Sequence, residues 1–319
     1  LVVLNTRSAI VLLNNSAKAV FHVGGDCVGK NILALSRSLS LQHAVQRAGE
    51  GKPSEATMEM DGRVYQLLAN PVRSPGETVT GVVLLVLDIT ERSNAEKMRR
   101  EFTANVSHEL KTPLTSISGY AEIMKNGLAK KEDMQEFSSR IYEESARLIT
   151  LIEDILELSQ LDEGSTFSDK EPVELLGLCR QVYQRLVPQA AQRGISFLIY
   201  GQPQEINGVR QILEEMVYNL FDNAIKYNKE GGKVEVTVKK EDGGPVLCVE
   251  DTGIGIPPEH QDKVFERFYR VDKSHSKQTG GTGLGLSIVK HGALFHDARV
   301  SLESQEGKGT KITIRFPQE

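Results

Sequence analysis

The stretch "SHELKTPLT", Ser107–Thr115, determines how the middle of this 319-residue chain is interpreted. A histidine stands beside a glutamate, a threonine follows the histidine by four residues, and a proline comes one residue later. The flanking segments "REFTANV" and "SISGYAEIM" have helical character, although a proline inside a helix normally bends or breaks it. We therefore expect a helix that bends just beyond His108, because Pro113 cannot donate to the carbonyl of Glu109.

Apolar residues extend the helical pattern on both sides of this stretch. They recur at three- and four-residue steps over about 102–128 and again over 134–161, with Gly127 and "AKKED" between the two runs. This pattern predicts an antiparallel helical hairpin. A single hairpin leaves its apolar seam exposed, so we expect two copies to pair into a four-helix bundle as a homodimer. Upstream, "ERSNAEKMRR" predicts a linker helix with Ser93 and Glu96 as its capping box.

Composition limits the class of protein. A hydrophobic fraction of 39% and a charged fraction of 25% are typical of soluble globular domains. The net charge of −5 argues against a nucleic-acid partner. Three widely spaced cysteines predict neither a disulfide framework nor a zinc site, and they favour a reducing, cytoplasmic compartment. The most apolar stretch, from Val79, is shorter than the roughly 18 residues of a membrane span. Because Leu1 already lies in a strand-like run, we expect a fragment, with a possible membrane anchor upstream.

The segments on either side of the hairpin mix helices and strands. In the first ninety residues, Asp61-Gly62 joins two strand-like segments in a hairpin, and "GVVLLVLDIT" predicts a buried central strand. The last part predicts an α/β sandwich of about 150 residues with a turn at Gly243-Gly244. Its expected helices cover 172–192, 208–228 and the region from about 284, and its expected strands cover 195–200, 233–240, 246–251, 299–303 and 310–316. The predicted domains are 1–90, 91–164 and 165–319.

The segment "EEMVYNLFDNAIKYN" places a polar set on one helix face, opposite an apolar stripe. The set consists of Asn219, Asn223, Lys226 and Tyr227. Two carboxamides one turn apart can offer oxygens to Mg²⁺, and a lysine one turn further on can meet a phosphate. Any one of these asparagines alone would fit a solvated helix face better, but the set together with the next two segments favours a nucleotide site.

Two glycine-rich segments extend this pattern. In "EDTGIGIPP", Asp251 ends a strand and can accept a hydrogen bond from the exocyclic amine of adenine, while Gly253 and Gly255 let the base approach the backbone. In "GGTGLGLSIVK", three glycines precede an apolar helix, where uncovered backbone N–H groups form an anion site. These three are Gly281, Gly283 and Gly285. Either segment alone also fits an ordinary glycine-rich turn.

The sequence between the two glycine-rich segments carries three aromatic residues, Phe265, Phe268 and Tyr269. They predict a lid that docks when ligand binds, although packing of a short helix would also explain them. Two other motifs are rejected. "GGDCVGKN" has Asn31 where a P-loop needs Ser or Thr, and "GTGLGL" lacks the spacing of a dinucleotide-binding fold.

Taken in order, "SHELKTPLT", "NLFDNAIKYN", "DTGIGI", "FERFYR" and "GTGLGL" resemble the H, N, G1, F and G2 boxes of sensor histidine kinases of two-component systems. The resemblance covers 91–319, while 1–90, ending in "DITE", resemble a PAS sensor domain. The implied fold class is multidomain α+β. A PAS-like α/β domain precedes an antiparallel helical hairpin that forms a dimeric four-helix bundle, and a Bergerat (GHKL) α/β sandwich that binds ATP follows.

The resemblance implies a role for each matching position in the hairpin. His108 resembles the phosphoacceptor, and Glu109 is placed to accept or stabilise the proton on the other ring nitrogen during transfer. Thr112 completes the family's H-E-x-x-T pattern, which implies that water is positioned to dephosphorylate a partner response regulator.

In the sandwich, the resemblance assigns the nucleotide contacts. Asn219 and Asn223 match the N-box pair, with Asn223 as the direct Mg²⁺ ligand. Lys226 and Arg270 would contact the phosphates, Tyr227 would line the adenine pocket, and Asp251 would bind the adenine amine. The glycines of the last box would let the lid fold over the triphosphate.

The expected function is ATP-dependent autophosphorylation on a histidine, followed by transfer to an aspartate of a cognate response regulator, with phosphatase activity toward that regulator. Two alternatives remain open: a GHKL ATPase that performs conformational work, and a catalytically silent binding module. The sequence departs from the family pattern at Val209, where many members have Asp, and at "HDAR" from His296, where a Gly-Gly turn is common. We expect the remaining histidines to be structural or solvated, namely His22, His43, His260, His275, His291 and His296.

Overall fold

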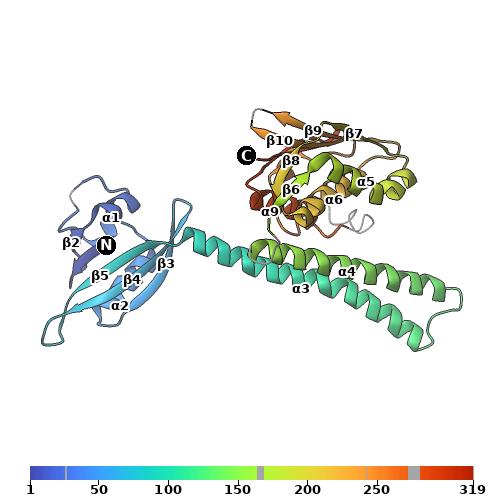
Figure 1. The fold of residues 1–319 in the computed structure, drawn as a ribbon. Helices are drawn as coiled ribbons and strands as arrows, with labels where there is room; N and C mark the ends of the chain where they lie inside the picture. The colour runs from blue at the N-terminus through green and yellow to red at the C-terminus, as the bar shows by residue number, and fades with distance from the viewer. Residues whose placement is uncertain (26, 164–168, 242, 272–280, 319) are drawn as a thin grey trace. The chain divides into compact units, whose positions relative to one another are not determined.

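The computed structural model describes residues 1–25, 27–163, 169–241, 243–271 and 281–318 (Figure 1). The chain divides into two compact units, Leu1–Thr103 and Ala104–Glu319, and each is described by itself. Among the described residues, no helix combines the length and apolar character that a membrane crossing requires.

The first unit is built on a five-stranded antiparallel sheet with the strand order β2-β1-β5-β4-β3. Its strands are β1 (Val2–Asn5), β2 (Ile10–Leu13), β3 (Ser54–Met60), β4 (Arg63–Arg73) and β5 (Val79–Asp88). Its short helices are α1 (Asn15–Val20), η1 (Ile32–Ala34) and α2 (Leu39–Gly49). Strand β5 is central, as expected, but only one of its faces is buried: Leu84 is buried, whereas Leu85 is 37% exposed. The β3–β4 hairpin is confirmed, because Asp61 and Gly62 both have the positive φ angles of a two-residue turn.

Helix α3 (Thr90–Lys125) follows β5 and is continuous through the expected linker. The predicted capping box is wrong, because Ser93 lies inside the first turn. Instead, Asp88 Oδ1 accepts hydrogen bonds from the amide and the hydroxyl of Thr90 at 3.0 and 2.5 Å, so an acceptor further upstream starts the helix earlier. Glu96 pairs with Arg92 at 3.3 Å. The helix continues through Pro113, and the expected bend there remains a prediction.

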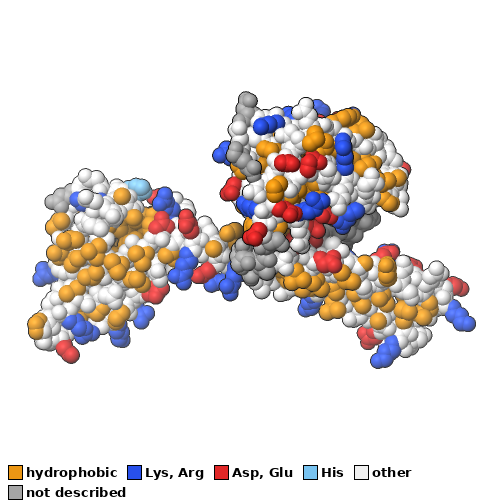
Figure 2. Space-filling model, in the orientation of Figure 1, with side chains coloured by type: hydrophobic (Ala, Val, Ile, Leu, Met, Phe, Trp, Pro, Cys, Tyr) orange, Lys and Arg blue, Asp and Glu red, His pale blue; other side chains and the backbone are white. Residues whose placement is uncertain are grey.

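The second unit contains the predicted helical hairpin, formed by the part of α3 from Ala104 onward and by α4 (Met134–Glu163). Tyr120 and Phe137 pack with ring centroids 5.2 Å apart, which joins the two helices near their connection. Several large apolar side chains of the hairpin are exposed in the single chain (Figure 2). They are Leu114, Ile123, Tyr142, Ile149, Ile152 and Leu156.

The predicted α/β sandwich forms the rest of this unit, with the sheet order β11-β12-β10-β9-β7. Its strands are β7 (Ser196–Gly201), β9 (Lys233–Glu241), β10 (Gly244–Asp251), β11 (Arg299–Gln305) and β12 (Gly309–Arg315). The helices are α5 (Leu175–Gln192), α6 (Arg210–Lys226), α7 (Pro258–Gln261) and α9 (Gly285–Phe295), and Figure 1 shows α5, α6 and α9 against the sheet. The sequence did not indicate the two-stranded sheet formed by β6 (Glu171–Glu174) and β8 (Glu205–Gly208).

The two departures from the family pattern meet in space. Val209 is the N-cap of α6 and supplies no capping side chain. Its amide donates instead to Nε2 of His296 at 3.0 Å, while Nδ1 of the same ring donates to the carbonyl of Gly292 at 2.7 Å. His296 is only 3% exposed, and burial lowers its pKa. A buried neutral histidine thus ties the start of α6 to the end of α9.

Candidate active site

The predicted polar face of α6 is half-buried and lies against the start of α9. The Nδ2 of Asn219 donates to the carbonyl of Glu215 at 3.0 Å, which fixes the orientation of its carboxamide. A Cβ atom added at Gly285 would lie 2.6 Å from Asn219 Oδ1 and 3.5 Å from Asn223 Nδ2. Glycine therefore lets the α9 backbone approach the Asn219 carboxamide this closely, whereas the distance to Asn223 is an ordinary contact.

The C-terminal end of α6 is held by two residues that the sequence did not single out. Nη1 of Arg193 donates to the carbonyls of Ile225 and Lys226 at 2.6 and 2.5 Å. Asn228 is 6% exposed, and its Nδ2 donates to the carbonyls of Ala224 and Lys233 at 3.1 and 3.0 Å. These bonds satisfy the last carbonyls of the helix and fix the backbone that carries Lys226.

The turn after β10 packs against this end of α6, as expected for one site. Oδ1 of Asp251 accepts a hydrogen bond from the amide of Gly253 at 2.7 Å. The amide of Ile254 donates to the carbonyl of Tyr227 at 3.1 Å, and a Cβ at Gly253 would lie 2.3 Å from the same oxygen. Gly255 has a φ of 67°, which favours glycine. Burial raises the pKa of Asp251 to about 6.

The second glycine-rich segment lies beside the same residues. A Cβ at Gly281 would lie 3.0 Å from the Tyr227 hydroxyl, and one at Gly283 would lie 2.9 Å from the backbone of Phe268. The amide of Phe268 donates to the carbonyl of Gly283 at 2.9 Å. The three aromatic residues of the predicted lid are half-buried, but most of the expected lid, 272–280, lies outside the described residues.

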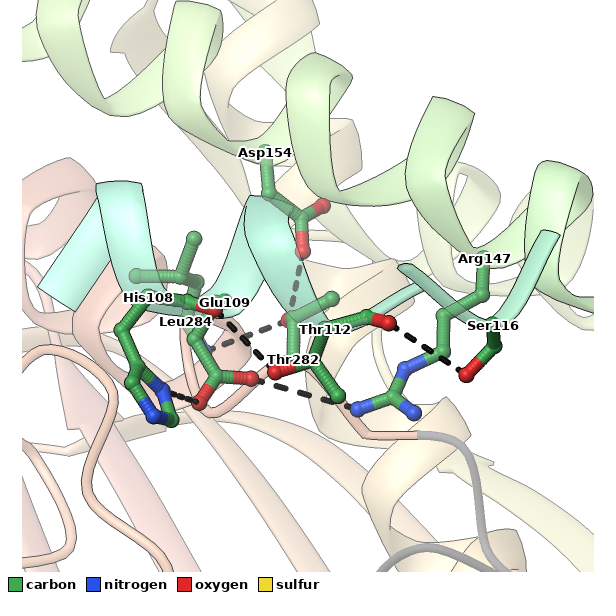
Figure 3. Close-up of polar contacts among 8 residues, drawn as sticks. All are labelled: His108, Glu109, Thr112, Ser116, Arg147, Asp154, Thr282 and Leu284. Atoms are coloured by element: carbon green, nitrogen blue, oxygen red, sulfur yellow. Dashed lines mark hydrogen bonds and ion pairs between the residues drawn. The ribbon is translucent and has the colours of Figure 1, made fainter. Parts of the chain in front are cut away.

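The hairpin presents His108 beside a cross-helix ion pair (Figure 3). The His108 side chain is 80% exposed, and its Nδ1 lies 3.6 Å from Glu109 Oε1. The other oxygen of Glu109 lies 3.9 Å from Nη2 of Arg147 on α4, a residue that the sequence did not single out. Thr112 lies on the same face, because its hydroxyl donates to the carbonyl of His108 at 3.2 Å.

Arg270 interacts electrostatically with residues of both the hairpin and the sandwich. Burial lowers its pKa, and the nearby charge of Arg147 lowers it further, whereas Tyr227 and Glu109 raise it. Within the second unit, Arg270 therefore lies in electrostatic range of Arg147 and Glu109 in the hairpin and of Tyr227 at the end of α6.

A hydrogen bond joins the glycine-rich segment to α4. The hydroxyl of Thr282 donates to Oδ2 of Asp154 at 2.6 Å and accepts from the amide of Leu284 at 3.3 Å (Figure 3). Burial raises the pKa of Asp154 to about 6 and that of Glu157, one turn further along α4, to about 8. Neither residue belongs to a motif that the sequence revealed.

Family models match two regions of the chain. Residues 208–319 match the model of the histidine kinase-, DNA gyrase B- and HSP90-like ATPases. Residues 98–164 match the model of the His Kinase A (phospho-acceptor) domain. The match at 208–319 supports the use of ATP.

Curated relatives and solved structures agree with these matches. The sensor kinases WalK of Bacillus subtilis and Staphylococcus aureus (strain Newman) are 30% and 32% identical over 98% of the chain, which spans 52% of each relative. The chain therefore spans about half the length of these curated relatives. The histidine kinase ThkA, solved in complex with the response regulator TrrA, has a similar fold, with a TM-score of 0.55 and 21% identity over 100% of this chain and 95% of that one.

A third solved structure, that of full-length ShkA in complex with AMPPNP, matches with a TM-score of 0.51 and 28% identity. It covers 68% of this chain and 45% of that one. With the helical hairpin matched by the phospho-acceptor model, the sandwich by the ATPase model, and WalK similar along nearly the whole length, the chain belongs to the two-component sensor histidine kinases.

Proposed function

We propose that this protein is an ATP-dependent protein-histidine kinase that phosphorylates itself on His108 and passes the phosphoryl group to an aspartate of a response regulator. The observation that carries the proposal is the exposed imidazole of His108. Its Nδ1 faces Glu109, which leaves Nε2 as the available nucleophile. Residues 208–319 of the same chain match the histidine kinase-, DNA gyrase B- and HSP90-like ATPases, which supports a nucleotide site there.

The proposed step needs a neutral imidazole. Histidine supplies this form near pH 7, because its ordinary pKa is about 6.5. Nε2 forms a bond to the γ-phosphorus as the bond to the β,γ-bridging oxygen breaks, and ADP leaves with that oxygen. The ring gains positive charge, which Glu109 stabilises by holding the Nδ1 proton. Arg147 positions the Glu109 carboxylate from the neighbouring helix.

We propose the nucleotide contacts that the family resemblance implies, and the geometry of the sandwich supports them. The Asp251 carboxylate would accept from the adenine amine, with Tyr227 and the Gly253 backbone beside the base. Lys226 and Arg270 would bind phosphate as cations, and the amides at the start of α9, beyond Gly281 and Gly283, would form an anion site. Gly255 lets the turn adopt its left-handed conformation.

The residues also fit a magnesium ion. No cluster of three or more His, Cys, Asp or Glu able to hold a metal occurs in the part of the chain that the structure describes. The carboxamides of Asn223 and Asn219, held against the Gly285 cradle, offer neutral oxygens that suit Mg²⁺ once phosphate oxygens complete its shell. Bound there, the ion would neutralise charge on the transferring phosphoryl group.

We propose domains at 1–90, 91–164 and 165–319. The antiparallel sheet of the first supports a PAS-like sensor domain. The exposed apolar side chains of the hairpin support pairing of two copies into a four-helix bundle.

Thr112 would position water for dephosphorylation of the regulator. Free cysteines at all three positions support a cytoplasmic setting.

Incubation with γ-labelled ATP and Mg²⁺ tests this proposal, comparing the wild type with His108→Gln, Asn223→Ala and the control His22→Gln. We expect the wild type and His22→Gln to carry label that survives alkali and is lost in acid. His108→Gln and Asn223→Ala should carry none. If His108→Gln labels as well as the wild type, the acceptor is misassigned. ATP hydrolysis without label would instead support a GHKL ATPase.

A further inference from the structure

The contact between Thr282 and Asp154 links α4 to the segment that would receive phosphate. A hydroxyl carries a single proton, and that of Thr282 is donated to Asp154 Oδ2 at 2.6 Å. The hydroxyl oxygen of Thr282 in turn accepts a hydrogen bond from the amide of Leu284, immediately before α9. The backbone on which the anion site depends is therefore tethered to a carboxylate on the hairpin.

Charge at this contact opposes a polyphosphate. Asp154 is half-buried, and Lys226 is the cation that acts on it, while Asp222 of α6 and Glu153 of α4 add like charge. Lys226 Nζ also lies 3.6 Å from Asp222 Oδ2. A triphosphate that draws Lys226 toward itself removes the attraction that stabilises Asp154 beside Thr282, and its own negative charge repels the carboxylate.

We propose that Asp154 is a further residue of the nucleotide site, which competes with the triphosphate for Thr282 and Lys226. The proposal rests on the proposed function, because it presumes that ATP phosphates bind at Lys226 and the start of α9. The coupling is reciprocal: triphosphate binding weakens the hold of α4 on the glycine-rich segment, and that hold weakens triphosphate binding by the same factor. Binding of ATP thereby frees the sandwich from α4.

Nucleotide affinity measured on the full chain tests the competition. Asp154→Ala is expected to tighten ATP binding by at least about 5-fold, the lower end of measured couplings between sites. Adenosine binding should not change, because the competition acts at the phosphates. Asp154→Asn keeps a hydrogen-bond acceptor and removes the charge, so its ATP affinity should fall between those of the wild type and Asp154→Ala. Glu143→Gln, an exposed acidic residue of α4 that pairs with Arg140 and takes no part in this contact, should bind ATP as the wild type does.

Substitutions of Thr282 provide a second test of the competition. Thr282→Ser keeps the hydroxyl and should preserve the wild-type ratio of ATP to adenosine affinity, whereas Thr282→Val should raise that ratio. In a double-mutant cycle, Asp154→Ala and Thr282→Val should be non-additive, since each removes the same hydrogen bond. Additive effects, or equal effects on ATP and adenosine, would overturn the proposal.

A distance measurement separates this proposal from the proposed function. Fluorophores attached at Gln135→Cys on α4 and Lys240→Cys on β9 should move apart when ATP is added, and Asp154→Ala should show the separated distance without nucleotide. If ATP binds and separates the labels but His108 is never phosphorylated, the kinase assignment fails and the competition stands. If ATP binds without separating the labels, or does not bind at all, the competition is wrong.

Discussion

The buried ring of His296 allows a quantitative test of how this sandwich holds the start of α6. In His296→Phe, the amide of Val209 loses its acceptor, while the carbonyl of Gly292 keeps the backbone amide of residue 296. One orphaned buried donor costs about 1–3 kcal/mol, and a value near the middle corresponds to about 30-fold faster local opening. The start of α6 should therefore exchange its amide hydrogens about 30-fold faster.

Hydrogen exchange with mass spectrometry measures this opening without assuming that the whole chain unfolds in one step. In His296→Phe, peptides covering 205–216 should exchange faster than in the wild type, and peptides covering β9 should exchange at the wild-type rate. Val209→Pro removes the donor from the other end at a φ of −82°, close to the range of proline. The two substitutions should therefore be non-additive. His43→Phe, an exposed histidine of the first unit, is the control.

The same bond fixes the direction of a pH effect. Because burial lowers the folded-state pKa of His296 below its ordinary value of about 6.5, the unfolded state binds the proton more readily. Its stabilisation is therefore present above about pH 6.5 and lost as the pH falls below it. The capping role of His296 would be refuted if His296→Phe exchanged its 205–216 amides at the wild-type rate and still lost stability at acid pH as the wild type does.

Three further predictions concern the site. Gly285→Ala should weaken ATP binding at least about 10-fold, because its Cβ would lie 2.6 Å from Asn219 Oδ1. Gly243→Ala, which has open space around it, should leave ATP binding unchanged in the same titration. Asp251→Asn should weaken ATP binding about 10- to 100-fold, and wild-type affinity should fall as the pH drops below about 6, where the carboxylate protonates. Arg147→Ala should slow autophosphorylation more than Arg140→Ala does, and equal rates would remove Arg147 from the site.

The sequence predicted the elements of this protein well wherever a local pattern determines structure. Helical spacing predicted the hairpin, and Asp61-Gly62 predicted a two-residue turn that the backbone angles confirm. The polar face of α6 and both glycine-rich segments lie together, because Gly253 lets its turn approach the backbone of Tyr227 and Gly285 lets the start of α9 approach the Asn219 carboxamide. The spacing of the polar and glycine residues along the sequence was enough to predict that they form one site.

Contacts between distant residues could not be predicted in this way. The bond between Val209 and His296 spans 87 positions, and that between Asp154 and Thr282 spans 128. No local pattern specifies either partner. The capping box failed for a different reason, because Asp88 offers an equally good acceptor further upstream, and the earlier cap determines where α3 begins.

We expect Nε2 of His108 to accept the γ-phosphoryl group while Glu109 holds the Nδ1 proton. Nuclear magnetic resonance of the full chain with ¹⁵N-labelled histidine, after incubation with ATP and Mg²⁺ at alkaline pH, tests it directly. A single phosphorus–nitrogen coupling is expected, assigned to Nε2 of His108 and absent in His108→Gln. Phosphorus on Nδ1, on another histidine, or on no histidine while ATP is consumed would contradict it.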